Sequence, residues 1–239
     1  PLCEKDKDLA TSINYTQIEN IVDVISDDQM ILYPNTNSGY GTRTDKGIVD
    51  ETDELTPISH YGKVKCQAEN YIMNESNGIS LRLATVFGVS SRMRTDLLVN
   101  DFVYKLLTDK YITLFEHEFV RNFIHIQDVS NAFELMINNY NKFQGEVFNV
   151  GLSDTNINKK ELVERIQKYI PNATLNYSNY YVDPDKRDYI VSNDKLESTG
   201  WKPQYSLDDG IQELITSYKM IVPHLSSFYQ NTTPLSYGV

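Results

Sequence analysis

The chain has 239 residues, with 33 acidic side chains against 22 lysines and arginines and a formal net charge of −11. Its length is ample for one or two compact lobes with a hydrophobic core. Because nucleic acids and anionic membranes attract basic surfaces, the acidic balance disfavours both as partners. No apolar run reaches the roughly 18 residues that a membrane-spanning helix needs, so we expect a soluble protein.

Cysteine and histidine usage limits the chemistry further. The two cysteines, Cys3 and Cys66, form neither a metal-ligand spacing nor a disulfide framework, which favours a reducing compartment such as the cytoplasm. The four histidines show no paired spacing, so we expect no structural or catalytic metal.

The first part of the chain alternates helical and strand patterns. Apolar residues recur at helical spacing over residues 9–25, and a short buried strand is predicted over 30–33. Ser59 is a candidate N-cap for a helix over 59–74, and a second buried strand follows over 79–86. This βαβ alternation predicts an α/β fold with a doubly wound parallel sheet.

From Ser90 onward helices and strands continue to alternate, and the tail over 223–239 has no clear period. We expect the tail to be irregular. The predicted helices cover residues 97–107, 128–139, 158–170 and 207–221, and the predicted strands cover 111–115, 146–150 and 174–177.

Tyr61 and Lys65 carry the strongest chemical signal. Residues four apart on a helix lie on the same face one turn apart, so the Lys65 ammonium can lie near the Tyr61 oxygen. A nearby cation favours the phenolate and lowers a phenol pKa that starts near about 10. Tyr61 could then act as a general base. Thr36 follows the first strand, at the carboxyl edge where open α/β sheets bind ligands.

A collinear series of motifs supports this interpretation. The series comprises Thr36-Asn-Ser-Gly-Tyr-Gly41, Pro57-x-Ser-x-Tyr61-Gly-x-x-Lys65, Leu81-Arg-Leu-Ala-Thr-Val-Phe-Gly88, Arg121-Asn-Phe-Ile-His-Ile-Gln-Asp128, Phe148-Asn-Val-Gly151 and Gly200-Trp-Lys-Pro203. Together they resemble the extended short-chain dehydrogenase/reductase family, the NAD-dependent nucleotide-sugar epimerases and dehydratases. The resemblance runs from Pro1 to about Met220.

The resemblance implies a Rossmann-type doubly wound sheet with a smaller α/β lobe for the nucleotide sugar. Residues 1–90 would belong to the dinucleotide-binding domain, and 120–150 would return to it. Residues 91–119 and 151–225 would form the substrate lobe, and 226–239 a tail. It also implies a homodimer formed through the helices over 9–25 and 59–74.

The resemblance assigns roles to the motif residues as well. Tyr61 would be the base, Thr36 would orient the C4 oxygen of the sugar, and Lys65 would lower the Tyr61 pKa and bond the nicotinamide ribose. Asn14 would support the cofactor and an active-site water. The cofactor would be NAD, with NADP not excluded. Without these roles, Thr36 caps a turn, Asn14 has no special task, and Tyr61 and Lys65 lie on a solvated helix face.

The expected substrate contacts follow the same resemblance. Arg121 and Arg187 would clasp the diphosphate, since planar guanidinium groups suit phosphate oxygens. Thr85 stands where many relatives have Asn, and Arg94 lies with Arg92 on a loop that enters the substrate lobe. For Thr85, simple strand packing is an equal alternative. For Arg94, a solvated loop is an equal alternative, and a surface ion pair is the alternative for the two other arginines.

Asn37 is a further expected substrate contact, and with Ser38 it bears on the reaction. Related dehydratases resemble Thr-Asp-Glu at these positions, whereas this chain has neither carboxylate. The resemblance therefore favours a 4-epimerase or 4-dehydrogenase acting on a UDP- or GDP-linked hexose or heptose. A 4-ketoreductase, a 4,6-dehydratase, a non-catalytic NAD-sensing regulator and a purely dimerising assembly protein are the alternatives.

One departure from the family concerns the phosphate loop. The chain begins with Pro1 and contains no Gly-x-x-Gly-x-x-Gly or Gly-x-Gly-x-x-Gly sequence. A cofactor pyrophosphate needs such a loop and the helix that follows it. We therefore expect this sequence to be part of a longer protein that lacks some 70 or more residues ahead of Pro1, at about 30 or more per βαβ unit. By itself it should bind NAD poorly.

Overall fold

The computed structural model describes residues 2–26, 28–43, 47–178 and 187–221. The expected tail lies outside the described residues. The helices are α1 (Leu2–Lys5), α2 (Lys7–Thr11), η1 (Ser12–Thr16), α3 (Gln17–Val22), η2 (Asn37–Tyr40), α4 (His60–Glu75), α5 (Leu98–Thr108), α6 (Ile126–Asn138), α7 (Tyr140–Phe143), α8 (Lys159–Gln167), α9 (Asp194–Glu197) and α10 (Leu207–Ile221). The strands are β1 (Leu32–Thr36), β2 (Ile48–Val49), β3 (Ile79–Leu83), β4 (Thr85–Phe87), β5 (Tyr111–Phe115), β6 (Val120–Arg121), β7 (Phe123–His125), β8 (Val147–Val150), β9 (Ile157–Asn158), β10 (Thr174–Ser178) and β11 (Ile190–Val191).

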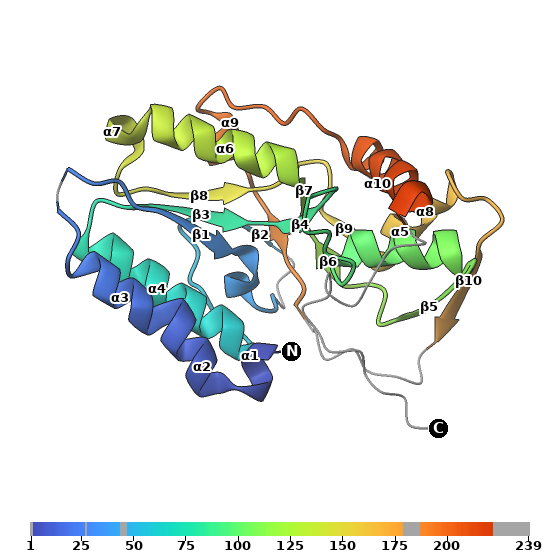
Figure 1. Cartoon of the computed structure of the whole chain (residues 1–239), viewed down its shortest axis with the longest axis horizontal. Coiled ribbons are helices and arrows are strands. Elements are labelled where there is room, and N and C mark those ends of the chain that lie inside the picture. The colour runs from blue at the N-terminus through green and yellow to red at the C-terminus, as the bar shows by residue number, and fades with distance from the viewer. Residues whose placement is uncertain (1, 27, 44–46, 179–186, 222–239) are drawn as a thin grey trace.

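A parallel sheet with strand order β1-β3-β8 forms the centre of the larger half of the molecule. Helices α3 and α4 cover one face of this sheet, and α6 and α7 cover the other (Figure 1). Leu81 in the middle of β3 pairs with Phe148 of β8, and both are buried. In β3 the apolar residues Ile79, Leu81 and Leu83 alternate with Ser80 and Arg82. Ser80 and Arg82 are buried too, so the sheet is covered on both faces. The expected Rossmann-type α/β architecture is confirmed.

Strand β1 lies at the edge of this sheet within the described residues. It contains Pro34, which has no N–H and is exposed. Proline is tolerated in an edge strand, where no ladder hydrogen bond is lost on the open side. The strand begins two residues later than expected, because the amide of Ile31 donates to the Tyr140 hydroxyl at 3.1 Å.

Helix α4 begins where the sequence predicts. The Ser59 side chain accepts a hydrogen bond from the Gly62 amide at 3.1 Å, which is the N-cap arrangement. The buried side chains Val64, Ala68 and Ile72 recur at helical spacing and face the sheet and α3. This cap and this apolar face fix where Tyr61 and Lys65 lie.

The helical pattern over residues 9–25 is confirmed as helix, with one difference. A π-helical turn, η1, interrupts it between α2 and α3. Such single turns hold one extra residue, and apolar spacing by itself does not reveal them. Ile13 and Ile21 are 50% and 52% exposed, so part of the apolar side of this helix is not covered by the described chain.

The single strand expected over 79–86 is two strands. The amide of Ala84 donates to Val150 of β8, whereas the next amide, Thr85, donates to the carbonyl of Asn122. Strand β4 therefore leaves the central sheet and pairs in parallel with β7. This exchange of partners is a tertiary event that the apolar run of the sequence does not show.

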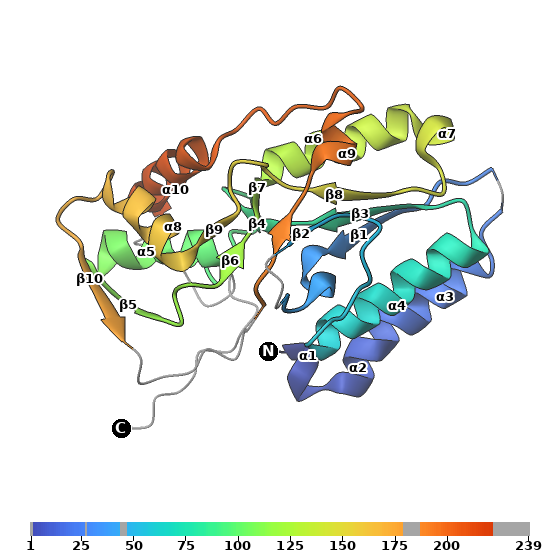
Figure 2. The same cartoon turned by 180° about the vertical axis from the view of Figure 1, so that it is seen from behind.

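The smaller half surrounds a second core, formed mainly by α5, α8 and α10 (Figure 1). Strands β5 and β10 pair in parallel beside these helices. Figure 2 shows β11 running from this half of the chain back to β2, with which it pairs in parallel. The domain boundaries expected from the sequence stay a prediction. None of the described helices combines the length and apolarity that crossing a bilayer requires.

Candidate active site

Thr36 is the last residue of β1 and caps η2. Its Oγ1 accepts a hydrogen bond from the Ser38 amide at 3.2 Å and lies 2.7 Å from the Ser38 Oγ. The side chain is half-buried at the carboxyl end of the sheet. Thr36 therefore has the position that the sequence predicts.

Gly62 brings the first turn of α4 against this loop. A Cβ at Gly62 would lie 2.9 Å from the Pro57 Cβ and 3.5 Å from the Ser38 carbonyl oxygen. Only a residue without a side chain permits so close an approach. The Tyr-Gly pair therefore places Tyr61 beside the segment that follows Thr36.

Tyr61 remains accessible, with 39% of the residue exposed. Burial of the phenol raises the pKa of Tyr61, and Cys3 nearby raises it further, whereas the cations of Arg187 and Arg94 lower it. The expectation that Lys65 lowers this pKa is wrong in direction. Among the described residues, the cations that act on Tyr61 are Arg187 and Arg94 rather than Lys65, and desolvation outweighs them.

Lys65 is buried one turn further along α4. Its Nζ lies 3.9 Å from the centroid of the Tyr33 ring, and the residue is 8% exposed. Burial lowers the pKa of Lys65 to about 8, although Glu69 acts in the opposite direction. Across the described residues, no oxygen accepts a hydrogen bond from Lys65 Nζ. Its three N–H donors are thus available to a ligand.

The N–H donors of Lys65 fit the nicotinamide end of a dinucleotide cofactor. A buried ammonium without an acceptor, one helical turn from an accessible phenol, suits the hydroxyls of a nicotinamide ribose. The fit covers this end of the dinucleotide, and the sequence of this chain supplies no glycine-rich loop for the pyrophosphate. In the part of the chain that the structure describes, no three His, Cys, Asp or Glu side chains group so as to hold a metal ion.

Asn37, which follows Thr36, is a further buried polar residue whose side chain has no hydrogen-bond partner among the described residues. It is 2% exposed, and neither its amide nitrogen nor its amide oxygen has a hydrogen-bond partner within the described structure. Leaving such a group buried costs about 1 to 3 kcal/mol. Asn14 differs, since it lies in the π-helical turn and its amide donates to the Ala10 carbonyl at 2.9 Å.

Arg187 reaches the site through backbone pairing. The Arg43 amide donates to the Asp188 carbonyl at 2.9 Å, and Thr42 bridges to the same residue. The segment after Thr36 is thereby tied to the segment that carries Arg187. Through this pairing the loop after Thr36 and the segment that carries Arg187 lie side by side, although they are far apart in sequence.

The other three residues predicted to contact the substrate are Arg121, Arg94 and Thr85. Arg121 is 3% exposed, donates to the Val120 carbonyl at 2.8 Å and lies 5.9 Å from the Tyr189 ring. Arg94 forms a two-point ion pair with Asp96 at 2.7 and 2.8 Å. Thr85 is half-buried at the start of β4, and its side chain makes no hydrogen bond to another described residue.

A buried ion pair between Glu69 and Arg82 was missed from the sequence. A signal existed, because Tyr61, Lys65 and Glu69 are spaced four residues apart and therefore share one helix face. Arg82 stands between Leu81 and Leu83 in a predicted buried strand, which also marks it as paired inside the fold.

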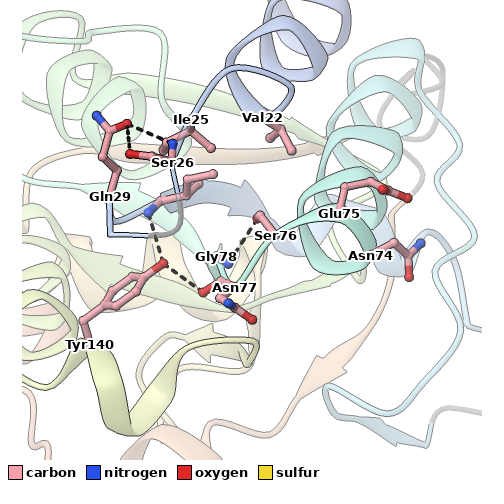
Figure 3. Close-up of a pocket in the computed structure, with 11 residues that line it drawn as sticks. Val22, Ile25, Ser26, Gln29, Asn74, Glu75, Ser76, Asn77, Gly78 and Tyr140 are labelled. Carbon is pink, nitrogen blue, oxygen red and sulfur yellow. Dashed lines mark hydrogen bonds between the residues drawn. The ribbon is translucent and has the colours of Figure 1, made fainter.

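A cavity of about 280 Å³ lies at the opposite end of the sheet. Figure 3 shows the Tyr140 hydroxyl at its edge, hydrogen-bonded to the Ile31 amide and to the Asn77 carbonyl at 2.8 Å. Ser76 and Gly78 line it at the amino end of β3. None of the predicted site residues lines this cavity, so it is distinct from the site at Tyr61.

Known proteins resemble this chain in sequence and fold. It is 30% identical over 179 residues to a dTDP-4-dehydro-6-deoxyglucose reductase of Escherichia coli, with 71% of the chain and 55% of the reductase covered. It is 26% identical over 229 residues to a putative UDP-glucose 4-epimerase of Methanocaldococcus jannaschii, with coverage of 92% and 71%. The chain thus spans little more than half of the reductase.

A solved structure has a similar fold. The UDP-glucose 4-epimerase of Thermus thermophilus in complex with NAD superposes with a TM-score of 0.77 at 19% identity, covering 91% of this chain and 73% of that one. The profile of the NAD dependent epimerase/dehydratase family matches residues 2–151. That span is more than half of the chain and contains β1, α4 and β3, and the first two of these present Thr36, Tyr61 and Lys65. The chain therefore belongs to the NAD dependent epimerase/dehydratase family.

Proposed function

We propose that this chain carries the catalytic residues of an NAD-dependent enzyme that oxidises the C4 hydroxyl of a nucleotide sugar, as a 4-epimerase or 4-dehydrogenase. The observation that carries the proposal is the arrangement on α4. An accessible Tyr61 lies one turn from the buried Lys65 ammonium, at the sheet edge where Thr36 ends β1. The similarity to a putative UDP-glucose 4-epimerase supports this class of reaction.

In this proposal each residue has one task. The Tyr61 oxygen takes the proton of the sugar hydroxyl, and the Thr36 hydroxyl holds the same sugar oxygen by a hydrogen bond. Lys65 donates to the ribose hydroxyls of the cofactor. NAD, when bound, accepts the hydride from C4 and adds a positive charge to the site. Because burial raises the Tyr61 pKa, the nearby cations of Arg94 and Arg187 help to form the phenolate.

Two classes of reaction fit these residues: oxidation of the sugar at C4, and reduction of a 4-keto sugar. Return of hydride to the other face of C4 gives an epimerase, and release of the keto sugar gives a dehydrogenase. A 4-ketoreductase uses the same residues in reverse, with Tyr61 donating its proton. The 30% identity to a dTDP-4-dehydro-6-deoxyglucose reductase favours keeping this second candidate.

Dehydration is disfavoured by the residues after Thr36. Loss of water from C5 and C6 needs an acid and a base beside the sugar ring. Asn37 and Ser38 supply an amide and a hydroxyl, neither of which titrates near neutral pH. The unpartnered amide of Asn37 instead has an NH₂ group that can donate to a sugar hydroxyl and a carbonyl oxygen that can accept from one.

The substrate would be held by its diphosphate. We assign Arg187 and Arg121 to this role, and the positive charge of Arg187 also lowers the Tyr61 pKa. Similar structures include one complex described with UDP-glucose and NAD, which supports a UDP-linked substrate.

We further propose that two copies associate through α2, α3 and α4. Leu9, Ile13 and Ile21 are each at least half exposed, and Val24 is 82% exposed. Apolar residues gathered along one helical side in this way are typical of a protein interface. Static light scattering of the protein tests this, with a monomer mass contradicting it.

The test of function supplies the purified full-length protein with NAD and, in turn, UDP-glucose and a GDP-linked hexose. Nuclear magnetic resonance of the sugar and absorbance of reduced cofactor are followed together. A new C4 epimer identifies an epimerase, and accumulation of reduced cofactor identifies a dehydrogenase. Binding of NAD with no change in any sugar would instead support a non-catalytic regulator and contradict the proposal.

A further inference from the structure

A charged pair is buried between α4 and β3. The side chains of Glu69 and Arg82 are 5% and 6% exposed, and Glu69 Oε1 lies 2.7 Å from an Nη of Arg82. Arg82 Nε also donates to the same carboxylate at 3.1 Å. Taking two ions out of water is costly, and replacing such a pair by apolar residues is often neutral or stabilising. Stability is therefore a weak reason for its presence.

The other hydrogen bonds of this pair lead to the candidate active site. Glu69 Oε2 accepts from Ser80 Oγ at 2.5 Å and from Asn35 Nδ2 at 2.7 Å. Asn35 directly precedes Thr36 in β1. Both carboxylate oxygens of Glu69 are thus occupied, and the carboxylate ties α4 to the strand that presents Thr36.

Arg82 extends the same network to the loop after Thr36. Its Nη1 donates to the Tyr40 hydroxyl at 2.9 Å, and Tyr40 is the last residue of η2. Tyr40 in turn donates to Asn149 of β8 at 2.8 Å. Helix α4, the central strands and η2 are therefore held in one relative position by a single set of buried polar contacts.

Glu69 also lies one turn from Lys65 on the same face of α4. The groups that act on the Lys65 ammonium within the described residues are Glu69 and Cys66 on α4, with the Tyr33 ring on β1 beneath it. Burial raises the pKa of the Cys66 thiol to about 12 and raises the pKa of Tyr33 as well. Both are therefore neutral near pH 7, and Glu69 is the anion that faces Lys65 in the described part of the chain.

We propose that Glu69, held by Arg82, is a positioning residue that keeps the Lys65 ammonium charged and aligns α4 with Thr36. The inference rests on the proposed function, because it assumes that Lys65 must carry its proton to bind the cofactor ribose. Glu69 itself touches neither substrate nor cofactor. It acts through Lys65 and through Asn35.

A purely structural role predicts different behaviour. If the pair only stabilised the fold, a variant that restores stability would also restore every property of the site. If the negative charge of Glu69 instead stabilises the Lys65 ammonium, the ionisation of Lys65 changes whenever the Glu69 carboxylate is removed, even in a variant of normal stability. Two variants separate these cases. Glu69→Gln leaves the Arg82 cation without an anionic partner, and Glu69→Gln combined with Arg82→Met removes both charges and puts an apolar side chain in place of Arg82.

The ionisation of Lys65 can be measured without cofactor or turnover. The protein is treated over a pH series with a trace of a small acylating reagent that reacts only with neutral amines, and mass spectrometry reports the extent of modification at Lys65. In the parent protein we expect a low midpoint, because burial lowers the pKa of Lys65 to about 8. Glu75→Gln is the matched control, since it removes one exposed carboxylate from the last turn of the same helix.

Both Glu69 variants should lower the midpoint for Lys65, whereas Glu75→Gln should leave it in place. For the first pH unit by which the midpoint falls, acylation at pH 7 rises about fivefold. Thermal unfolding should show the single variant destabilised and the double variant recovered. An unchanged midpoint in the double variant, or a midpoint that returns as stability returns, would overturn the inference. Failure of the proposed function would appear separately, as a parent protein that transforms no sugar.

Discussion

The Lys65 ammonium lies 3.9 Å above the centre of the Tyr33 ring and has no oxygen acceptor among the described residues. A buried cation held only by a ring face keeps all three N–H donors available. The contact joins α4 to β1, the two elements that present Tyr61 and Thr36. It is therefore both a packing contact and the basis of a ligand site.

Because Lys65 is buried, we expect the stability difference between Lys65→Met and the parent protein to depend on pH. The pKa of Lys65 is lowered from 10.5 to about 8, so the fold disfavours the charged form. Between pH 8 and 10.5 the unfolded chain binds a proton that the native chain does not, and stability rises with pH in that window. Below pH 8 the full cost of the buried charge is present. Lys65→Met should therefore be more stable than the parent near pH 7, by at most about 3 kcal/mol.

Urea unfolding of Lys65→Met and of the parent at pH 7 and near pH 10 measures this difference. The gap between the two proteins should shrink as the pH rises. The same variant should bind NAD more weakly in calorimetry, because the ribose loses its donor. A variant that is less stable than the parent at pH 7 would show that the cation–ring contact outweighs the desolvation of Lys65.

Tyr61→Phe should abolish oxidation at C4 and leave the fold intact. The substitution removes one oxygen and with it the only atom of this side chain that can take a proton. Tyr71→Phe is the matched control on the same helix, since its hydroxyl bonds Asp23 at 2.6 Å on the exposed side. Turnover of sugar nucleotide is measured for both variants, and activity of Tyr61→Phe near the parent level would refute its role as the base.

Incubation with nucleotide sugars should give no 4-keto-6-deoxy product. Asn37 and Ser38 lack the carboxylates that elimination of water would need. Mass spectrometry of the sugar nucleotide checks this, because dehydration lowers its mass by one water. Detection of that product would mean that another acid and base reach C5 and C6.

Arg187→Ala should raise the KM for the nucleotide sugar by roughly tenfold to hundredfold, since a charge-assisted contact to phosphate contributes about 1.5 to 3 kcal/mol. Arg121→Ala should do the same, with added loss of stability because this residue is 3% exposed. Uniform loss of binding leaves kcat nearly unchanged. Arg165→Ala on α8 serves as the control.

Calorimetry with the sugar nucleotide decides between two sets of arginines. If Arg187→Ala and Arg121→Ala both bind like the parent, the diphosphate contacts must be sought at Arg92 and Arg94. Binding of the dinucleotide should change little in either variant, because these residues are assigned to the substrate side.

Local features of the sequence were enough to determine the main elements of the fold. Ser59 and the apolar spacing that follows it defined α4, since an N-cap and a 3.6-residue period are local properties. The strand over 111–115 and the helix over 207–221 were predicted with the same bounds that the structure has. The family also followed from sequence, because collinear motifs are a linear pattern.

The tertiary structure decided the properties that depend on several distant segments. The split of residues 79–86 into two strands arises because Ala84 and Thr85 bond different neighbours. The pKa of Tyr61 is raised because desolvation, which depends on everything packed around the phenol, outweighs the nearby cations. Glu69 and Arg82 meet only when α4 packs on β3. Contacts, burial and charge in three dimensions are therefore what a one-dimensional pattern leaves undetermined.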